Sequence, residues 1–499
     1  MLTQLTSFQN IGLQSERITV EVGYHRGEAK MVIVGLGDTA VQESKQRVWM
    51  ALRSSGYHLS TGRVTTVNLA PADLRKTGPR YDLSIALGIL VANGALVVPE
   101  EKLKDMAFVG ELALDGALRH VNGVLSAAIA CRKQGIPTLV VPSMNGAEAA
   151  LIPGIKVIAP HTLRELAEIL HGDRPPDEIE PPASSLKNEL PSGLIDFSDV
   201  RGQKHAKRAL EIAAAGGHNV LLNGAPGAGK TLLARAFRGI LPPLSQEESI
   251  EVSQIYSVAN LLPEDEPLVR TRPFRLVHHT ASGVSIVGGG QVPGPGEISL
   301  AHRGVLFLDE LAEFPAQVLE VLRQPLEDRE ITIARAQGTV TFPADFIMVA
   351  AMNPAQYSAG GASRIKSRIS EPLLDRIDLT IDIQPVPIEE LQNKPKKKGE
   401  TTAEILHRVI FARDRQAKRF KNFSITTNNE MNVKQIDSLC SLDDQSKQLL
   451  KQAVNRMNLT VRGYHRTIKV ARTIADLAGE EKIECGHIAE ALQYRQTTA

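Results

Sequence analysis

The sequence is poor in the features that define several classes of protein. It has three cysteines in 499 residues, Cys131, Cys440 and Cys485, which are far apart and form no C-x-x-C pair. A disulfide framework and a cysteine zinc site are therefore excluded, and a cytoplasmic location is expected. Positive charge is not in excess, because 57 Lys and Arg face 56 Asp and Glu. Bulk charge therefore does not hold this chain on nucleic acid, and any contact with DNA must be local.

Long apolar runs are also missing. The N-terminal segment carries polar side chains at every few positions, which is unlike a secretory signal. The longest apolar stretch, residues 83–98, is interrupted by Ser84, Asn93 and glycines. It is shorter than the ~20 residues that a membrane span needs. We therefore expect no contact with a membrane.

The chain is long enough for roughly three domains at ~150 residues each. Proline-rich breaks at 173–197 and 384–400 interrupt it. We expect an N-terminal domain (1–172), the linker 173–197, a middle domain (198–385) and a C-terminal domain (386–499). Apolar strands alternate with helices in the middle domain, which predicts an α/β fold with a parallel sheet. The C-terminal domain has helical periodicity.

A phosphate-binding loop lies near the start of the middle domain. An apolar strand precedes the pattern G-x-x-x-x-G-K-T and a helix follows it, which is the context that this motif requires. Backbone N–H groups of such a loop surround phosphates, its lysine contacts the β and γ oxygens, and its threonine ligates Mg²⁺. The predicted ATP-binding residues are Gly224, Ala225, Pro226, Gly227, Ala228, Gly229, Lys230 and Thr231.

Two further apolar strands end in polar residues that suit hydrolysis. Asp309 is expected to hold Mg²⁺ together with Thr231, and Glu310 to deprotonate the attacking water. Asn353 follows the next strand and is a candidate for positioning that water, with a plain turn residue as the alternative. The sequence therefore predicts the capacity to hydrolyse ATP.

An arginine in an apolar setting is a further candidate. Arg376 stands just before another strand, where its charge requires an anionic partner. The γ-phosphate of a neighbouring subunit is one such partner. The alternative is a salt bridge within the chain, to Asp375 or Asp378.

The phosphate loop, LFLDE, AMNP and LLDRID resemble the nucleotide motifs of an AAA+ ATPase. The resemblance to magnesium-chelatase-like AAA+ proteins of the ComM/YifB type is closer, since it includes GGGQVPGPGEISLAHRGVLFLDELAEF and LTVRGYHRTIKVARTIADLAG. It implies that Asn353 is the sensor-1 residue, Arg376 an arginine finger acting in trans, and Arg462 the sensor-2 arginine, with Arg466 as the competing candidate. It also implies ATP and Mg²⁺ as cofactors, a helical lid at 386–499, and a homo-hexameric ring with sites between subunits.

Two insertions in the middle domain correspond to the helix-2 insert and pre-sensor-1 hairpin of the family. Residues 278–299 are too rich in glycine for a core element, which predicts a projecting loop whose adjacent histidines lack further metal-ligand spacing. Residues 329–342 alternate around a short turn, which predicts a β-hairpin with Arg335 and Gln337 at its tip. Such hairpins in related ATPases grip DNA in a pore, so both residues are candidate DNA contacts. A solvated hairpin tip is the alternative.

Residues 78–142 resemble the α+β domain of Lon-type proteases. The Ser–Lys dyad of that chemistry is missing, because Arg80 or Tyr81 stands at the serine position and Leu125 near the lysine position. We expect no proteolysis, but contacts with DNA or neighbouring subunits, with a solvated surface as the alternative. The candidate basic residues are Arg47, Arg53, Arg63, Arg75, Lys76 and Arg80. The same alternatives apply to a helical stripe of Arg408, Arg415 and Arg419.

The resemblance implies a cytoplasmic ring ATPase that couples ATP hydrolysis to movement along DNA, whether branched, single-stranded or double-stranded. Its expected work is helicase and branch-migration activity that promotes homologous recombination of incoming DNA in natural transformation, with recombination proteins as partners. The alternative is a magnesium-chelatase-type motor that remodels a protein partner, which the Lon-like first domain disfavours. The residues by themselves indicate only the ATPase.

Overall fold

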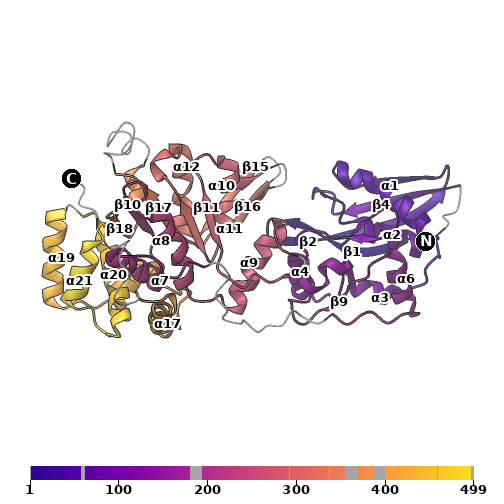
Figure 1. The fold of residues 1–499 in the computed structure, drawn as a ribbon. Coiled ribbons are helices and arrows are strands. Elements are labelled where there is room, and N and C mark those ends of the chain that lie inside the picture. Colours follow the sequence, from indigo (N-terminus) through magenta and orange to yellow (C-terminus); the bar gives the residue numbers. More distant parts are fainter. Residues whose placement is uncertain are drawn as a thin grey trace. The chain divides into compact units, whose positions relative to one another are not determined.

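The computed structural model of the chain is shown in Figure 1. It forms two compact units, Met1–Leu186 with Gln246–Val269, and Lys187–Ser245 with Arg270–Ala499. Each unit is described here by itself. The residues that the structure describes are 2–57, 62–179, 194–263, 265–290, 293–335, 338–354, 369–386, 399–457 and 459–495.

The first unit is built on a seven-stranded mixed sheet in the order β3-β4-β2-β1-β5-β8-β9. Its two long strands, β1 and β2, pair antiparallel around a turn at Gly12, whose φ of 60° favours glycine. A small second ladder joins β6 to β7. The strands are β1 (Leu2–Ile11), β2 (Gln14–Arg26), β3 (Lys30–Val34), β4 (Arg63–Ala70), β5 (Met106–Phe108), β6 (Glu111–Leu112), β7 (Leu118–Arg119), β8 (Thr138–Val140) and β9 (Lys156–Ile158).

Helix α2 lies at the centre of the first unit. Each of its residues is buried, as is typical of a helix that is apolar on every side. It packs on β1 and β2, whereas α4 is the centre of a second apolar cluster against β5 and β8. The helices are α1 (Thr39–Ser54), α2 (Asp82–Ala92), α3 (Glu100–Lys104), α4 (Val124–Gln134), α5 (Gly146–Ala149), α6 (Leu163–His171) and α9 (Gln246–Val258).

Helix α9 comes from the middle of the chain but packs in the first unit. Its Gln254 donates to the Leu13 carbonyl at 2.7 Å and to Ser126 Oγ at 3.1 Å. Its Ser257 hydroxyl donates to the buried carboxylate of Glu148, and Ile250 packs against the apolar cluster around α4. Residues 246–269 therefore belong to the first unit, although they lie inside the predicted range 198–385. The sequence gives no sign of this arrangement.

Several basic residues of the first unit are used inside the fold. Arg47 pairs with the fully buried Asp82 at 2.8 Å. Lys76 is also fully buried, and its ammonium group donates to the carbonyl of Pro71. Arg80 donates to the carbonyl of Asn122 at 2.8 Å. The expectation of a DNA-facing or solvated surface is therefore wrong for Lys76, which is fully buried. Arg47 and Arg80 also bind partners in their own chain but are only partly buried, so for them it stays a prediction.

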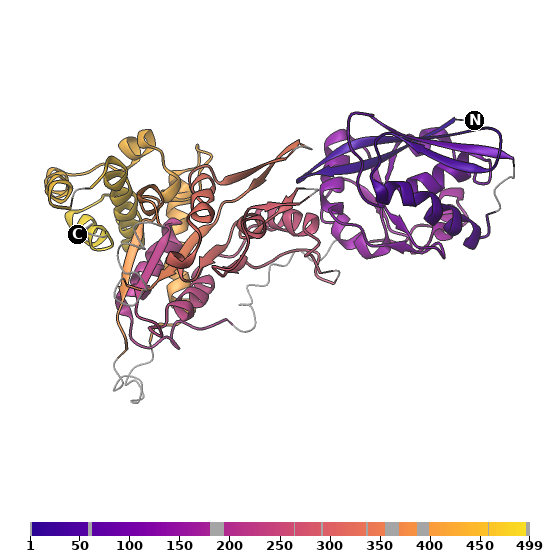
Figure 2. The same ribbon diagram turned by 90° about the horizontal axis from the view of Figure 1, so that it is seen from above.

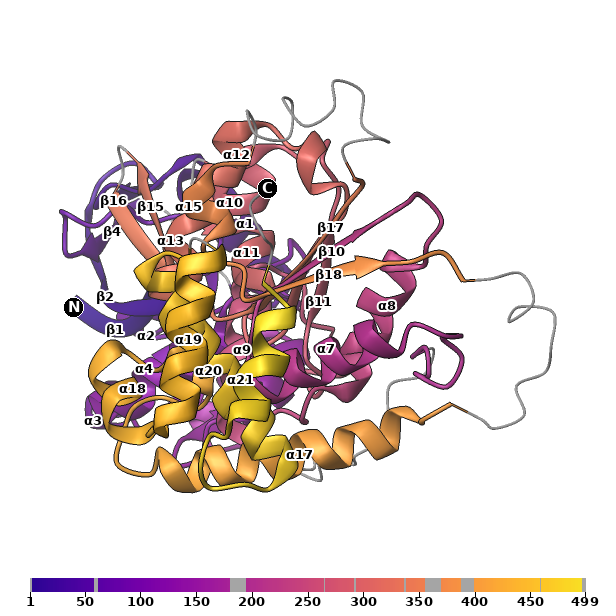
Figure 3. The same ribbon diagram turned by 90° about the vertical axis from the view of Figure 1, so that its left-hand side faces the viewer.

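The second unit contains a five-stranded parallel sheet in the order β11-β14-β17-β10-β18, and this confirms the predicted α/β fold. Figure 3 shows β10 between β17 and β18. The carboxyl ends of parallel strands meet at one edge, so the segments after β10, β14 and β17 lie together there. The strands are β10 (Val220–Gly224), β11 (Phe274–Val277), β14 (Val305–Leu308), β17 (Ile347–Met352) and β18 (Leu379–Ile383).

The expected hairpin is present as β15 (Glu330–Arg335) and β16 (Gly338–Pro343), paired antiparallel. Figure 2 shows these two strands projecting from the body of the second unit. The predicted loop 278–299 contains more structure than expected, because Ile286 and Ile298 are buried. Its elements are α10 (Gly283–Val287), β12 (Gly288–Gly289), β13 (Gly294–Pro295) and α11 (Glu297–Leu300). Helices α12 (Ala316–Val321) and α13 (Arg323–Asp328) precede the hairpin.

The predicted helical C-terminal region is confirmed, and it shares one apolar core with the sheet. Helix α7 (Lys204–Gly216) lies between them: it contacts β18, α17 and α20, and Arg413 of α17 donates to its Ala214 carbonyl at 2.9 Å. The remaining helices are α8 (Lys230–Phe237), α15 (Glu371–Leu374), α17 (Thr402–Arg419), α18 (Val433–Leu439), α19 (Asp444–Met457), α20 (Val461–Ala478) and α21 (Cys485–Gln493).

The helical arginine stripe is anchored inside the second unit. Arg419 donates to the fully buried Asp476 at 2.8 Å, and Arg472 pairs with the same carboxylate at 3.1 Å. Arg415 donates to the Glu480 carbonyl at 3.0 Å, and Arg408 pairs with Glu211. Each of these arginines thus binds an acceptor of its own chain, while the side chain of Arg408 stays 37% exposed. That the stripe also faces DNA, a subunit or solvent stays a prediction.

The buried carboxylate of Asp476 makes a prediction about stability. Asp476→Ala is expected to lower the free energy of unfolding by about 3–5 kcal/mol, because it leaves the guanidinium groups of Arg415, Arg419 and Arg472 without their shared counter-ion. Urea unfolding of the purified protein measures this change. Asp444→Ala is the control, since the Asp444 side chain is 95% exposed and its loss should cost less than about 0.5 kcal/mol. Equal effects of the two substitutions would contradict the prediction.

Within the described part of the chain, the helices lack the combination of length and apolar character that crossing a membrane requires.

Candidate functional site

The predicted phosphate loop leaves the carboxyl end of β10 and enters α8. Gly227 and Gly229 have φ values of 78° and 92°, which glycine adopts at low cost. A Cβ atom on Gly224 would lie 2.7 Å from the Ile383 carbonyl oxygen of neighbouring β18. The loop is therefore a tight backbone turn that leads into the N-terminus of a helix. Backbone N–H groups at such a position stabilise a bound anion.

Lys230, the first residue of α8, is held inside this loop. Its Nζ donates to the carbonyls of Gly224 and Ala225 at 2.6 and 2.9 Å, and to Oδ1 of Asn353 at 3.0 Å. Burial lowers the pKa of Lys230, and the charges of Asp309 and Glu310 oppose this change. The loop carbonyls therefore accept the hydrogen bonds of the Lys230 ammonium group. The oxygens of a bound phosphate would compete with them for the same N–H donors.

Thr231 and Asp309 lie side by side, although they are far apart in the sequence. Thr231 Oγ1 donates to Asp309 Oδ2 at 3.2 Å. Asp309 follows β14, which is buried along its whole length, so its position is fixed by the sheet. A hydroxyl and a carboxylate are hard oxygen donors, and Mg²⁺ is usually held by one or two such groups together with phosphates and water. This donor pair fits the ion predicted there.

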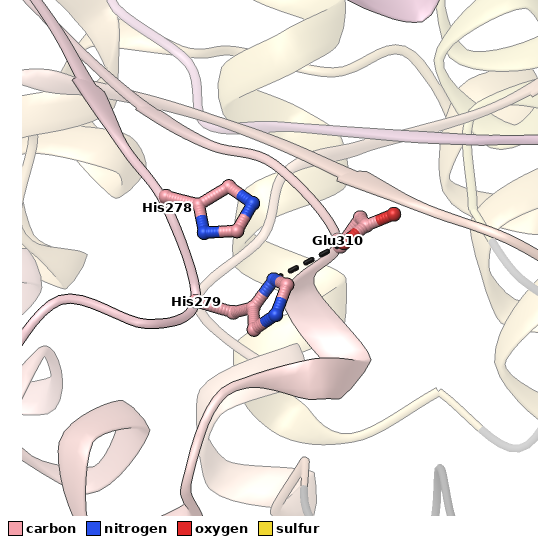
Figure 4. A group of neighbouring side chains, drawn as sticks. All are labelled: His278, His279 and Glu310. Atoms are coloured by element: carbon pink, nitrogen blue, oxygen red, sulfur yellow. Dashed lines mark ion pairs between the residues drawn. The ribbon is translucent and has the colours of Figure 1, made fainter.

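Glu310 has an unusual backbone conformation. Its φ is 53°, in the left-handed region that residues other than glycine rarely adopt, and its N–H donates to Asp309 Oδ1 at 3.0 Å. Its carboxylate lies 3.1 Å from Nδ1 of His279 (Figure 4). Ligand atoms of His278, His279 and Glu310 lie within 4.8 Å of one another.

The histidine contact was missed from sequence. His278 and His279 follow β11 just as Glu310 follows β14, and these two strands are neighbours. The sequence shows only that polar residues follow each of these two strands. It does not show that the strands are neighbours in the sheet, so the contact could not be predicted. The tertiary structure therefore adds a partner to the predicted catalytic base.

Arg376 lies at the opposite edge of the sheet from the phosphate loop. It precedes β18, and its carbonyl accepts from Asn219, which precedes β10. The five residues of β18 separate the two edges by roughly 15 Å, at ~3.3 Å per residue. Its guanidinium group pairs with Glu327 of α13, so the predicted alternative of Asp375 or Asp378 names the wrong carboxylate.

The two sensor-2 candidates have different surroundings. Arg462 is half-exposed and lies 3.4 Å from Glu327, the carboxylate that also binds Arg376. Arg466 is mostly buried and lies 3.3 Å from the buried Asp378. The pKa of Glu327 is lowered, chiefly by its contact with Arg376. The structure thus places Arg376 and Arg462 on one face, and Arg466 inside the unit.

The candidate DNA contacts lie mainly outside the described residues. The backbone of Arg335 ends strand β15, but its side chain and the whole of Gln337 are not among the described parts. Their predicted role stays a prediction.

Comparison with protein families gives matches along most of the chain. Residues 196–391 match "Magnesium chelatase, subunit ChlI", residues 20–145 match "Subunit ChlI of Mg-chelatase", and residues 399–495 match "Magnesium chelatase, subunit ChlI C-terminal". Because these models span both compact units, the similarity is not confined to the phosphate loop.

Two of the relatives are similar over nearly their full length, and a third over a smaller part. The competence protein ComM of Haemophilus influenzae is 43% identical over 97% of this chain and 96% of its own. YifB of Escherichia coli is 41% identical over 97% of this chain and 95% of its own. A magnesium-chelatase 67 kDa subunit of Chlorobaculum tepidum is 27% identical over only 39% of this chain and 27% of its own. The chain therefore belongs to the ComM/YifB family of magnesium-chelatase ChlI-like AAA+ ATPases.

Proposed function

We propose that this chain is an ATP-driven DNA motor that works as a homo-hexameric ring. Its expected activity is helicase and branch migration on branched, single-stranded or double-stranded DNA, which promotes recombination of incoming DNA in natural transformation. The observation that carries the proposal is the 43% identity to a competence protein along 97% of the chain. The arrangement of the phosphate loop and the strand-end carboxylates supports its ATPase part.

The proposed hydrolysis site uses residues at one edge of the sheet. Residues 224–231 bind the phosphates of ATP, with Lys230 on the β and γ oxygens. Thr231 and Asp309 hold Mg²⁺, which neutralises charge on the phosphates when bound. Glu310 takes a proton from the attacking water, and Asn353 orients that water. Support comes from the contacts of Lys230 with Asn353 and of Thr231 with Asp309.

The proposed ring follows from the place of the candidate arginines. Arg376 is separated by the length of β18 from the loop of its own subunit. An arginine that stabilises the γ-phosphate must contact it. We therefore propose that Arg376, and Arg462 beside it, act on the nucleotide of the next subunit. Head-to-tail contacts of this kind form a ring when the rotation between neighbouring subunits closes.

A magnesium-chelatase-type motor that remodels a protein partner is the second candidate. The names of the three family models favour it. The match with the chelatase subunit itself, however, covers only 39% of this chain, whereas the match with ComM covers both compact units. The DNA motor is therefore the better supported proposal.

A branched-DNA assay tests the proposal. The purified protein is expected to bind a synthetic four-way junction and to convert it to duplex products in the presence of ATP and Mg²⁺. Glu310→Gln should bind ATP and the junction but leave the junction unconverted, because it lacks the base that activates water. Native gels of labelled DNA measure both steps. A wild-type protein that hydrolyses ATP but neither binds nor converts branched or forked DNA would exclude the DNA motor.

A further inference from the structure

Two imidazole rings lie beside the proposed catalytic base and have no part in the proposed hydrolysis. We propose that His278, His279 and Glu310 form a binding site for a transition-metal ion such as Zn²⁺, and that the bound ion inhibits hydrolysis. The binding of the ion is independent of the proposed function. Its inhibitory effect rests on that function, because it requires Glu310 to be the base.

The first support is the gathering of three ligand side chains. One ligand atom of each residue lies within 4.8 Å of the other two. Figure 4 shows both rings beside the Glu310 carboxylate. The sequence offers the two histidines no third ligand nearby, but β14, the neighbour of β11 in the sheet, supplies it at its carboxyl end. The tertiary structure therefore completes a ligand set that the sequence leaves incomplete.

The second support is the spacing of His279 and Glu310. Nδ1 of His279 lies 3.1 Å from Oε2 of Glu310. Two ligand atoms at ~2.1 Å from one tetrahedral Zn²⁺ ion lie roughly 3.4 Å apart, so the pair needs to open by only a few tenths of an ångström. This nitrogen is shielded from solvent and makes no hydrogen bond within the described part of the chain. An unpaired buried polar atom costs free energy, and an ion bound between the two groups would remove that cost.

The third support is the orientation of the two rings. Successive side chains of a strand point to opposite faces, but both histidines follow the end of β11, and their ring centroids are 4.1 Å apart. The fully buried Phe314 contacts the His279 ring edge-to-face at 6.5 Å. Nδ1 of His278 lies 2.9 Å from Thr280 Oγ1, which leaves its Nε2 for a metal. Contacts of this kind orient the ligands of metal sites.

The donor set selects the kind of ion. Imidazole nitrogens suit Zn²⁺ and related transition metals, whereas Mg²⁺ prefers oxygen ligands. Two histidines and one glutamate are a ligand set of zinc sites that keep a fourth position open for water. The side chains of His279 and Glu310 are 28% and 46% exposed, so an ion can enter from solvent. The proposed Mg²⁺ site is separate, because Thr231 and Asp309 offer oxygen donors only.

An ion at this site would take the base away from the water. A carboxylate that ligates Zn²⁺ has lost the lone pair and the freedom with which it accepts a proton, and general base catalysis requires both. The phosphate loop supplies none of the three ligands and stays open to nucleotide. Hydrolysis is therefore expected to stop while ATP still binds.

Calorimetric titration of Zn²⁺ into nucleotide-free protein without an affinity tag tests the site. One ion per subunit is expected to bind, and His278→Ala should weaken its binding about 100-fold, the upper end of the effect of removing a group that supports a metal ligand. Glu310→Gln should also weaken binding, since it removes the third ligand at constant volume. His25→Ala is the matched control and should bind as the wild type does, because His25 is an exposed histidine of β2. Absence of stoichiometric binding, or unchanged binding by His278→Ala, would overturn the proposal.

ATPase measurements with buffered free Zn²⁺ test the inhibition. At saturating Mg²⁺ and ATP, the rates of wild type and His25→Ala should fall in proportion to the fraction of occupied sites, while a fluorescent ATP analogue still binds. The rate of His278→Ala should stay at its own zinc-free value. Zinc binding without a loss of rate, or equal inhibition of His278→Ala, would contradict the inhibitory role. Wild-type protein that hydrolyses no ATP in the absence of Zn²⁺ would instead refute the proposed function, and the titration would still decide whether the site exists.

Discussion

The Lys230→Ala variant is expected to lose ATP hydrolysis by ~10²- to 10³-fold in kcat/KM, the range found when one preorganised donor is removed from a charged transition state. The ammonium group of Lys230 lies inside the loop, where it donates to two loop carbonyls and to the side chain of Asn353. Phosphate oxygens are stronger acceptors than these neutral groups, so binding of ATP transfers the lysine from the loop to the nucleotide. Alanine supplies no charge for this exchange.

A coupled-enzyme ATPase assay measures the loss, and nucleotide binding shows which step fails. Lys204→Ala is the matched control: Lys204 is an exposed lysine at the first position of α7, and its removal should leave the rate unchanged. Glu310→Gln provides the contrast, because it keeps the lysine and should bind ATP without hydrolysing it. Retention of wild-type kcat/KM by Lys230→Ala would show that ATP binds elsewhere.

The Arg376→Ala variant is expected to hydrolyse ATP ~10³-fold more slowly, which is the lower end of the effect of an arginine that contacts the transferred phosphate. In the single chain, Arg376 is 6% exposed and pairs with Glu327. A nucleotide of the next subunit must compete with Glu327 for this guanidinium group. Arg376→Lys should not restore the rate, because a lysine cannot offer the same planar pair of donors.

Mixing of two inactive variants tests whether Arg376 acts between subunits. Arg376→Ala subunits keep the phosphate loop, and Lys230→Ala subunits keep the arginine. In a random equal mixture, about a quarter of the interfaces of a head-to-tail ring combine both intact parts, so activity should reappear. Arg323→Ala is the control, since Arg323, in α13, is likewise an arginine paired with a glutamate, Glu320. Mixtures that stay as inactive as their components would argue against action in trans.

The signal for the predicted nucleotide site is local. The phosphate loop, its lysine and its threonine are consecutive residues between a strand and a helix, and glycines occupy the two positions with positive φ. Asp309 and Asn353 each end an apolar strand, and parallel strands bring their ends to one edge. Their contacts with Thr231 and Lys230 follow from that topology.

Charged side chains were predicted less well. Arg419, Arg47 and Lys76 all look like surface residues in the sequence, yet each contacts an acceptor of its own chain. The cost of burying these charges is offset by partners 5 to 57 positions away. Neither the helical periodicity of the sequence nor its net charge identifies such partners, because the partners become neighbours only when the chain folds.

By itself, the sequence determined the ATPase family, the parallel α/β core, the hairpin and the helical C-terminal region, because each depends on neighbours in the chain. Only the tertiary structure decided three other features. It placed α9 in the first unit, Arg376 with Arg462 on Glu327, and His279 on Glu310. Each of these pairs residues that are distant in sequence. Strand order and packing bring them together, and no local pattern of side chains encodes that order.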